Sequence, residues 1–288
     1  MIFLIKVLQF KYWIIFSAPP GIALALMRFG GWIIYSIARM TSFKKTVARN
    51  VETLFPQSNG LEIADKLLKT VSYSIFELLC QPYFKAEHFK RLFAWEGMEN
   101  LNRALEHKKG VLLLTLHAGN YELIPAAVGN LGYKMNSILR STDDPIFKIL
   151  NESRRHQNVN IINVSEQDMY RETIQLLGKN ELVGTLADTG ALEGRHVMLN
   201  FLGKEVPAAT GWLTLAQRAE TMVVPVLTRK EGGKNVITLY EPFSVTKDTR
   251  EPAMQKAHRI FEDFVRQHPD QWGIFLNSYE VKRMVEGK

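Results

Sequence analysis

The sequence predicts an α/β fold in which helices flank a mixed, largely parallel sheet, preceded by a hydrophobic anchor. From Gly110 onward, short apolar runs with β propensity alternate with segments of helical periodicity. The chain has 288 residues, of which 46% are hydrophobic and 23% charged, so it can bury a sizeable core. We therefore expect an N-terminal anchor over residues 1–40 and a folded domain over residues 41–288.

The first 40 residues are rich in apolar and aromatic side chains. Tyr12–Met27 reads YWIIFSAPPGIALALM, and Phe29–Ala38 reads FGGWIIYSIA. Each run is short for a span of about 20 apolar residues, and Pro19-Pro20 would interrupt a straight helix. Tyr and Trp are typical of the headgroup level, so a membrane-embedded or interfacial anchor is predicted. A buried core helix is the alternative. A cleaved signal peptide fits less well, because aromatic apolar sequence continues past the plausible cleavage site.

A basic segment and a long amphipathic segment follow the anchor. Thr41–Arg49 suits an anionic leaflet, or is an ordinary solvated helix face. After the break at Pro56–Gly60, Asn59 and Glu62 resemble a capping box. The helix that it opens is core or a further membrane-facing surface. Its apolar stripe comprises Ala64, Leu67, Leu68, Val71, Ile75, Leu78 and Leu79.

The alternation after Gly110 predicts individual elements. The expected strands are Val111–Leu116, Met135–Leu139, Asn160–Val164, Leu182–Ala187, Met222–Leu227 and Val236–Tyr240. The expected helices are Leu123–Leu131, Ile146–Asn158, Asp168–Gly178, Leu213–Ala219 and Glu251–Gln267. Chemistry in such folds lies at the carboxyl ends of strands, where His117 and Asp188 are expected.

The stretch LLLTLHAGNYELIP, from Leu112 to Pro125, holds two ionisable groups, His117 and Glu122. Residues five apart face away from each other on a helix or a strand. A strand that ends at His117, turns through Gly119 and Asn120, and enters a helix near Glu122 would bring the two together. The segment is therefore predicted to be a strand, a functional turn and a helix.

An imidazole is the natural general base near neutral pH, and a carboxylate can fix its tautomer. The chain has no G-x-S-x-G motif, and its one cysteine, Cys80, lies in the apolar run IFELLC. Cys80 reads as a buried small hydrophobe more readily than as a nucleophile. We therefore expect His117 to take a proton from a substrate hydroxyl, with direct transfer and no covalent intermediate.

The net charge of +7 suggests an anionic partner. An anionic membrane face, an acidic carrier protein and nucleic acid would all fit this charge. The sequence has no zinc-finger spacing, no RNP-like motif and no long Lys/Arg block, so nucleic acid is disfavoured. Nothing in the sequence suggests a metal requirement, and one cysteine permits no internal disulfide.

The segment LLLTLHAGNYE resembles the H-x4-D/E signature of glycerolipid acyltransferases. It is most similar to the H-x-G-N-W/Y-E form in the lipid A biosynthesis acyltransferases, the lauroyl/myristoyl transferase family. Upstream, ARNVETLFP resembles a segment that follows the anchor of that family. Further similar positions, in the family's order, are Arg140, Arg154, Asp188, Phe201-Leu202-Gly203, Ala209-Thr210-Gly211 and Pro269-x-Gln271-Trp272.

This resemblance implies transfer of a fatty acyl chain from acyl carrier protein or CoA to a hydroxyl of a membrane lipid, first of all a lipid A precursor. The thioester is a co-substrate and no other cofactor is expected. His117 would be the base and Glu122 its orienting carboxylate. The implied location is the cytoplasmic face of the bacterial inner membrane. The substrate-binding residues would be Asn120, Arg140, Arg154, Asp188, Thr210 and Gly211, with the two arginines suited to phosphate.

Two departures from the family pattern bear on the acceptor. Thr189 follows Asp188 where the family commonly has Gln, and GIFLNSYEVKR follows Trp272 where lipid A enzymes usually carry a His/Arg-rich run. Another glycolipid or phospholipid acceptor therefore stays open. The sequence also leaves open the length of the acyl chain, the choice between carrier protein and CoA, and the oligomeric state. It does not decide whether residues 1–40 span the membrane or lie on it.

Two other function classes remain as alternatives. A non-catalytic lipid-binding or membrane-scaffolding protein could keep the same fold, in which case conservative changes at His117 or Glu122 would be tolerated. A metal-dependent hydrolase could use His117, Glu122, Asp188 and His196, although the sequence lacks the H-E-x-x-H spacing.

Overall fold

A seven-stranded sheet forms the centre of the protein. The computed structural model describes residues 15–139, 151, 153–155, 157–164, 168–188 and 196–286. The strand order is β1-β9-β8-β2-β5-β3-β4, and every neighbouring pair is parallel except β8 and β9. The strands are β1 (Phe93–Glu96), β2 (Val111–Thr115), β3 (Met135–Leu139), β4 (Val159–Asn163), β5 (Leu182–Leu186), β8 (Met222–Glu231) and β9 (Lys234–Leu239). The predicted mixed, largely parallel α/β fold is confirmed.

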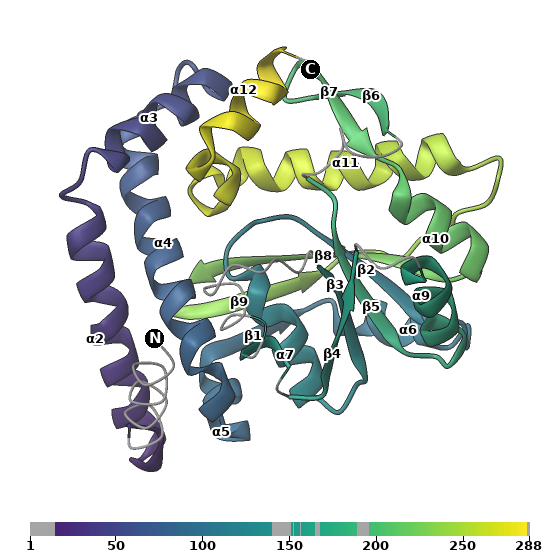
Figure 1. Ribbon diagram of the computed structural model, residues 1–288, viewed down its shortest axis with the longest axis horizontal. Coiled ribbons are helices and arrows are strands. Elements are labelled where there is room, and N and C mark those ends of the chain that lie inside the picture. The colour runs from purple at the N-terminus through teal and green to yellow at the C-terminus, as the bar shows by residue number, and fades with distance from the viewer. Residues whose placement is uncertain are drawn as a thin grey trace.

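Helices surround the sheet, and a separate antiparallel hairpin of β6 (His196–Phe201) and β7 (Lys204–Ala209) lies beside α11 and α12 (Figure 1). The α-helices are α2 (Pro20–Ala38), α3 (Phe43–Leu54), α4 (Gly60–Cys80), α5 (Ala86–Leu92), α6 (Met98–Leu105), α7 (Ile124–Asn130), α9 (Met169–Gly178), α10 (Gly211–Ala219), α11 (Arg250–Gln267) and α12 (Ser278–Glu286). Short 3₁₀ helices are η1 (Gln81–Tyr83), η2 (Tyr121–Leu123), η4 (Pro269–Gln271) and η5 (Gly273–Leu276).

Strand β2 shows why the sheet is covered on both faces. Leu112 and Leu114 point into one apolar cluster, which includes residues of α9, α10 and α11. Val111 and Leu113 point into a second cluster, with residues of α5, α6 and α7. Side chains alternate across a strand, so a continuous apolar run places one hydrophobic row on each face.

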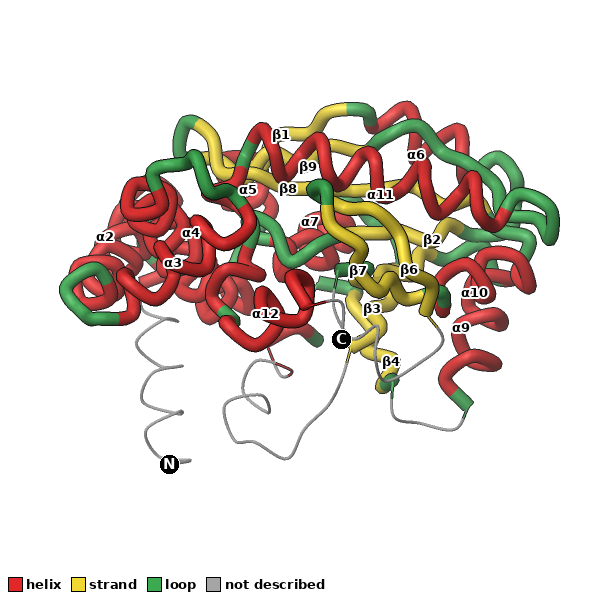
Figure 2. Tube along the Cα trace, turned by 90° about the horizontal axis from the view of Figure 1, so that it is seen from above, coloured by secondary structure: helices red, strands yellow, loops and turns green. Residues whose placement is uncertain are grey.

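The helices α2, α3 and α4 pack together along one side of the molecule (Figures 1 and 2). Asn59 accepts a hydrogen bond from the Glu62 N–H, which is one of the two bonds of a capping box, and α4 begins there. Pro20 occupies the first turn of α2, where proline is tolerated, and thus starts this helix instead of interrupting it.

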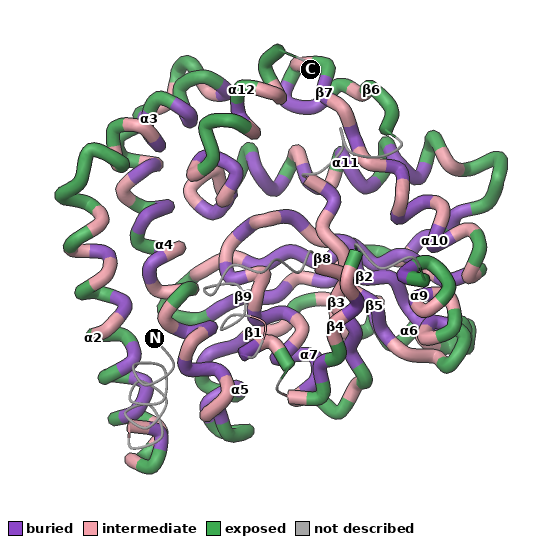
Figure 3. The backbone as a smooth tube through the Cα atoms, in the orientation of Figure 1, coloured by how far each residue is buried: buried purple, intermediate pink, exposed green. Residues whose placement is uncertain are grey.

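Helix α2 has a largely exposed apolar face (Figure 3). Its 19 residues have a length of about 28 Å at 1.5 Å per residue, comparable with the apolar core of a bilayer. Among the described residues, only this helix is long and apolar enough to cross a membrane. The exposed apolar side chains of α2 are Ile22, Leu26, Phe29, Trp32, Ile33 and Ile37.

The predicted strands and helices after Gly110 match the structure to within a few residues, except that β8 runs on to Glu231. Most of the predicted helix Ile146–Asn158 lies outside the described residues. Sequence patterns did not predict α5, β1, α6, the β6–β7 hairpin or α12, all of which are short elements of 4 to 9 residues.

Candidate active site

The turn after β2 carries His117 at the carboxyl edge of the sheet. Ala118 pairs with Trp272 in an antiparallel bridge, the Gly119 N–H donates to Gln271 O at 2.7 Å, and the Gly273 N–H donates to His117 O at 2.6 Å. Gly119 has φ +57°, and a Cβ there would meet the Thr228 carbonyl oxygen at 2.2 Å. Only glycine therefore fits this turn.

Asp188, which follows β5, is the carboxylate that contacts the imidazole. His117 Nδ1 lies 2.7 Å from Asp188 Oδ1, and the His117 backbone N–H donates to Asp188 Oδ2 at 3.0 Å. Trp272 Nε1 donates to the same Oδ2 at 3.0 Å. The side chain of Asp188 is 5% exposed and that of His117 is 28% exposed. This arrangement favours the Nδ1–H tautomer and leaves Nε2 as the basic nitrogen.

The electrostatics of the pair support an imidazole that holds a proton well. Burial opposes the imidazolium, but the Asp188 carboxylate outweighs burial and raises the pKa of His117 above its ordinary value. Burial opposes the ionised Asp188 too, and the charge and hydrogen bonds of His117 outweigh it, so the pKa of Asp188 is lowered. The pair is thus built to stabilise an imidazolium next to a carboxylate.

Glu122 does not make the contact that the sequence analysis expected. It forms a bidentate ion pair with Arg154, from Nε at 2.8 Å and from Nη2 at 2.5 Å, and no hydrogen bond joins it to the imidazole. Burial lowers the pKa of Arg154, but the bonded Glu122 outweighs burial and raises it. The ring of Tyr121 contacts the imidazole, with its centroid 4.9 Å from that of His117. Glu122 still contributes a negative charge that raises the pKa of His117.

A cavity of about 460 Å³ extends from His117 along one face of the sheet. Alternate residues of β2, Leu113 and Thr115, line it in the same row as His117. From Leu113 to His117 is four residues, or about 13 Å at the strand rise of about 3.3 Å per residue. Further lining comes from α7, β3, β4, β5 and β8, and from Glu122 and Arg154; the other side chains are mainly apolar. The volume lies in the range typical of ligand pockets, about 300–1,000 Å³.

Two polar side chains lining this cavity have unpaired atoms. Gln81 is fully buried, and neither Oε1 nor Nε2 of its amide has a partner among the described residues. Ser137 Oγ is buried and unpaired in the same way. Unpaired buried polar atoms are costly, so these groups are positions where a bound molecule could accept or donate a hydrogen bond.

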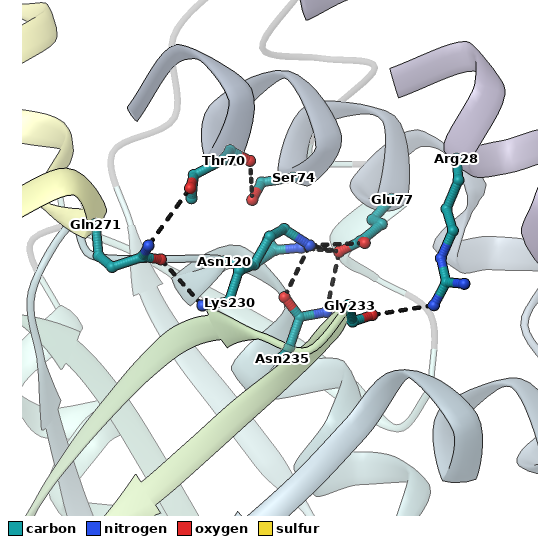
Figure 4. A network of polar contacts seen from close by, with 9 residues as sticks. All are labelled: Arg28, Thr70, Ser74, Glu77, Asn120, Lys230, Gly233, Asn235 and Gln271. Carbon is teal, nitrogen blue, oxygen red and sulfur yellow. Dashed lines mark hydrogen bonds and ion pairs between the residues drawn. The ribbon is translucent and has the colours of Figure 1, made fainter. Parts of the chain in front are cut away.

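The other predicted site residues are distributed differently. Asn120 is buried, and its side chain donates to Glu77 of α4 instead of capping η2 (Figure 4). Thr210 lines a second groove, beside β6, α10 and α11, and does not line the cavity at His117. Gly211 begins α10. Arg140 and Thr189 lie outside the described residues.

The groups considered for a metal do not form a ligand set in the part of the chain that the structure describes, where no cluster of three His, Cys, Asp or Glu side chains occurs. His196 lies on β6 and lines the second groove, away from the cavity that His117 and Glu122 share. Cys80 is buried, and burial raises the pKa of its thiol far above the ordinary range, which suits a structural residue.

Sequence patterns did not predict the buried polar network in which the Glu77 carboxylate contacts the side chains of Asn120, Lys230 and Asn235. The signal of Glu77, Lys230 and Asn235 in the sequence is weak, because each is a polar residue in an otherwise unremarkable helix or strand. Gln271 and Trp272 were noted only as part of a motif, and the structure places Gln271 against the turn that carries His117 and Trp272 against Asp188.

Comparisons with known proteins give one family. A sequence model described as bacterial lipid A biosynthesis acyltransferase matches residues 2–280. A search of curated proteins finds no match. Among solved structures, the 1-acyl-sn-glycerophosphate (LPA) acyltransferase PlsC from Thermotoga maritima is similar with a TM-score of 0.40 and 15% sequence identity, covering 85% of this chain and 98% of that chain.

Proposed function

Because the chain belongs to the bacterial lipid A biosynthesis acyltransferase family, we propose that it transfers a fatty acyl chain from an acyl thioester to a lipid hydroxyl, with His117 as general base. Family membership makes the protein an acyltransferase that acts on a lipid A precursor. The donor, the mechanism and the residues are the proposal.

The observation that carries the mechanism is the His117–Asp188 pair, whose imidazole lines the cavity. With Nδ1 bonded to Asp188, His117 Nε2 accepts the proton of the acceptor hydroxyl. The oxygen attacks the thioester carbonyl, and the tetrahedral intermediate collapses with cleavage of the C–S bond. The imidazolium then returns its proton to the leaving thiolate, so no acyl-enzyme forms.

The cavity supports an acyl-binding role. An extended hydrocarbon chain advances about 1.3 Å per carbon, given C–C bonds of about 1.5 Å. The distance of about 13 Å from His117 to the row of Leu113 would thus hold about ten carbons. Glu122 and Arg154 line the same cavity. We assign this ion pair a position beside the thioester end of the acyl group, near the carbonyl that reacts. Arg140, Thr210 and Gly211 remain candidates for acceptor or carrier contacts.

The proposed setting is the cytoplasmic face of the inner membrane. The apolar face of α2 and the expected anchor over residues 1–40 support contact with the bilayer, and residues 41–288 would form the catalytic domain. The net charge of +7 supports contact with an anionic leaflet and with an acidic acyl carrier protein.

The test is acyl transfer by the full-length protein in vesicles that contain a lipid A precursor. Acyl carrier protein and CoA thioesters are supplied separately, and mass spectrometry follows the acceptor. We expect the acceptor to gain one acyl mass with wild type and to lose this gain with His117→Ala at equal protein level. The intact protein should show no acyl adduct during turnover. Wild-type transfer by His117→Ala would refute His117 as the base. If His117→Ala also restored the lipid profile of cells that lack the protein, a non-catalytic scaffold would be supported instead.

A further inference from the structure

Glu77 of α4 is a buried carboxylate that the proposed mechanism does not use. Its side chain is 5% exposed. Four hydrogen-bond contacts surround it: Lys230 Nζ lies 2.7 and 2.8 Å from its two oxygens, Asn120 Nδ2 donates at 2.6 Å, and Asn235 Nδ2 donates at 3.0 Å (Figure 4). A buried charge needs such compensation, and Glu77 receives it from three different segments.

These contacts close a ring that includes the catalytic turn. Asn120 follows Gly119, whose N–H donates to Gln271 O. The side-chain Oε1 of Gln271 accepts from the Lys230 N–H at 3.0 Å, and Lys230 Nζ returns to Glu77. The turn is therefore held by its backbone on the side of η4 and by the Asn120 side chain on the side of α4.

Within the described residues, the bond to Glu77 is the only one that the Asn120 side chain makes, since Asn120 Oδ1 is buried and unpaired. Asn120 lies three residues after His117 on the same turn. Because Gly119 lies so close to β8, this turn has little room to change its conformation. A displacement of Asn120 would therefore move the imidazole relative to Asp188.

We propose that Glu77 is a positioning residue for acyl transfer: its carboxylate, compensated by Lys230, holds Asn120 and thereby sets His117 against Asp188. This inference rests on the proposed role of His117 as base. The alternative is that Glu77 and Lys230 only fasten α4 to the β8–β9 hairpin.

Two double variants separate these roles. Glu77→Gln with Lys230→Met removes both charges and keeps an oxygen that can accept from Asn120. Glu77→Leu with Lys230→Met removes both charges and the acceptor, and it leaves no unpaired buried charge. We expect kcat of the Gln variant to stay within about 3-fold of wild type, and kcat of the Leu variant to fall roughly 10–100-fold with little change in KM.

The pH profile is the second readout. The charged groups that act on His117 are Asp188, Glu122 and Glu280 of α12. If the imidazole moves away from Asp188, the carboxylate offsets less of the effect of burial, and the pKa of His117 falls. The acidic limb of kcat/KM should therefore shift to lower pH in the Leu variant only. Equal kcat and equal acidic limbs in the two double variants would overturn the proposal.

Single variants at two asparagines provide the matched comparison if the Leu variant fails to fold. Asn120→Ala and Asn235→Ala each remove one Nδ2 donor to the same Glu77 oxygen, but only Asn120 belongs to the turn. We expect Asn120→Ala to lower kcat and shift the acidic limb, and Asn235→Ala to do neither. The same kinetic effect from both would refute the positioning role. Absence of transfer by wild type would instead refute the proposed function.

Discussion

At the scale of single residues, the basicity of His117 depends on a carboxylate 71 positions away in the sequence. The pKa of His117 is raised, so the neutral base forms only as the pH rises through a value above the ordinary 6.5. Protonated His117 also stabilises the fold: this contribution is full below the unfolded pKa of about 6.5 and is lost as the pH rises through the folded pKa.

Replacing Asp188 with Asn tests this dependence. Without the carboxylate, the pKa of His117 falls, and the acidic limb of kcat/KM moves to lower pH. The plateau should drop roughly 10²–10⁴-fold, because the imidazolium loses its partner. Measurement of kcat/KM from pH 5 to 9 checks both effects. A limb that stays in place would show that Asp188 does not control this ionisation.

Gln81 allows a prediction about stability. Because both amide atoms are buried and unpaired, Gln81→Met should raise the free energy of unfolding of the ligand-free protein by about 1 kcal/mol. Chemical denaturation measures this change. Gln271→Met is the matched control, since the Gln271 amide bonds Lys230 N and Asp270 Oδ2, and it should destabilise the protein. Equal destabilisation by both changes would mean that the Gln81 amide has a partner in solution.

At the scale of elements, the floor of the cavity is formed where β2, β5 and β3 lie side by side. Leu113 pairs with Gly184, and Gly184 pairs with Ser137, so these three share one row about 13 Å from His117. A Cβ at Gly184 would meet Met135 Cε at 2.6 Å, which is the end of a flexible side chain. A larger residue at Gly184 should therefore narrow the cavity without breaking the sheet.

Gly184→Val should accordingly shorten the preferred acyl chain. We expect donors longer than about ten carbons to lose roughly 10-fold or more in kcat/KM, and shorter donors to change little. A series of acyl thioesters of increasing length measures this. Gly178→Ala is the control, because a Cβ at Gly178 meets nothing within 4 Å. An equal loss for all chain lengths would place the acyl group elsewhere.

The strand–turn–helix reading of LLLTLHAGNYELIP was correct as local structure but wrong about the contact it implied. Local pattern predicts β2 and the turn, since apolar runs and Gly-Asn turns are short-range signals. The partner of His117 comes from the pairing of β2 with β5, in which Thr115 lies opposite Leu186. His117 and Asp188 each lie two residues beyond this pair and therefore meet. Sequence periodicity does not specify which strands are neighbours, so it could not predict this contact.

At the scale of the whole molecule, α2 packs against the rest of the folded chain. Arg28 of α2 donates to Gly233 O in the β8–β9 turn at 3.0 Å, and α2 packs along α4. The helix therefore fixes the orientation of the sheet relative to any bilayer that α2 contacts.

Substituting glutamate for both Ile33 and Ile37 should weaken binding to anionic lipid vesicles at least about 10-fold, because two charges would enter the apolar face. These side chains are 41% and 63% exposed and lie one turn apart on α2. Vesicle flotation measures the bound fraction. Leu131→Glu, at an exposed position after α7, should leave binding unchanged. Unchanged binding of the α2 variant would refute α2 as the membrane contact.

By itself, the sequence determined the α/β class, most of the strands and helices, the apolar N-terminal segment and the resemblance to one family. These follow from local periodicity, turn residues and ordered motifs, which depend on neighbours in the chain. Only the tertiary structure decided that Asp188 rather than Glu122 contacts the imidazole, that Glu122 pairs with Arg154, and that Glu77 accepts a hydrogen bond from Asn120. Each of these contacts joins residues more than 30 positions apart, and strand order and helix packing, not local propensity, bring them within hydrogen-bond distance.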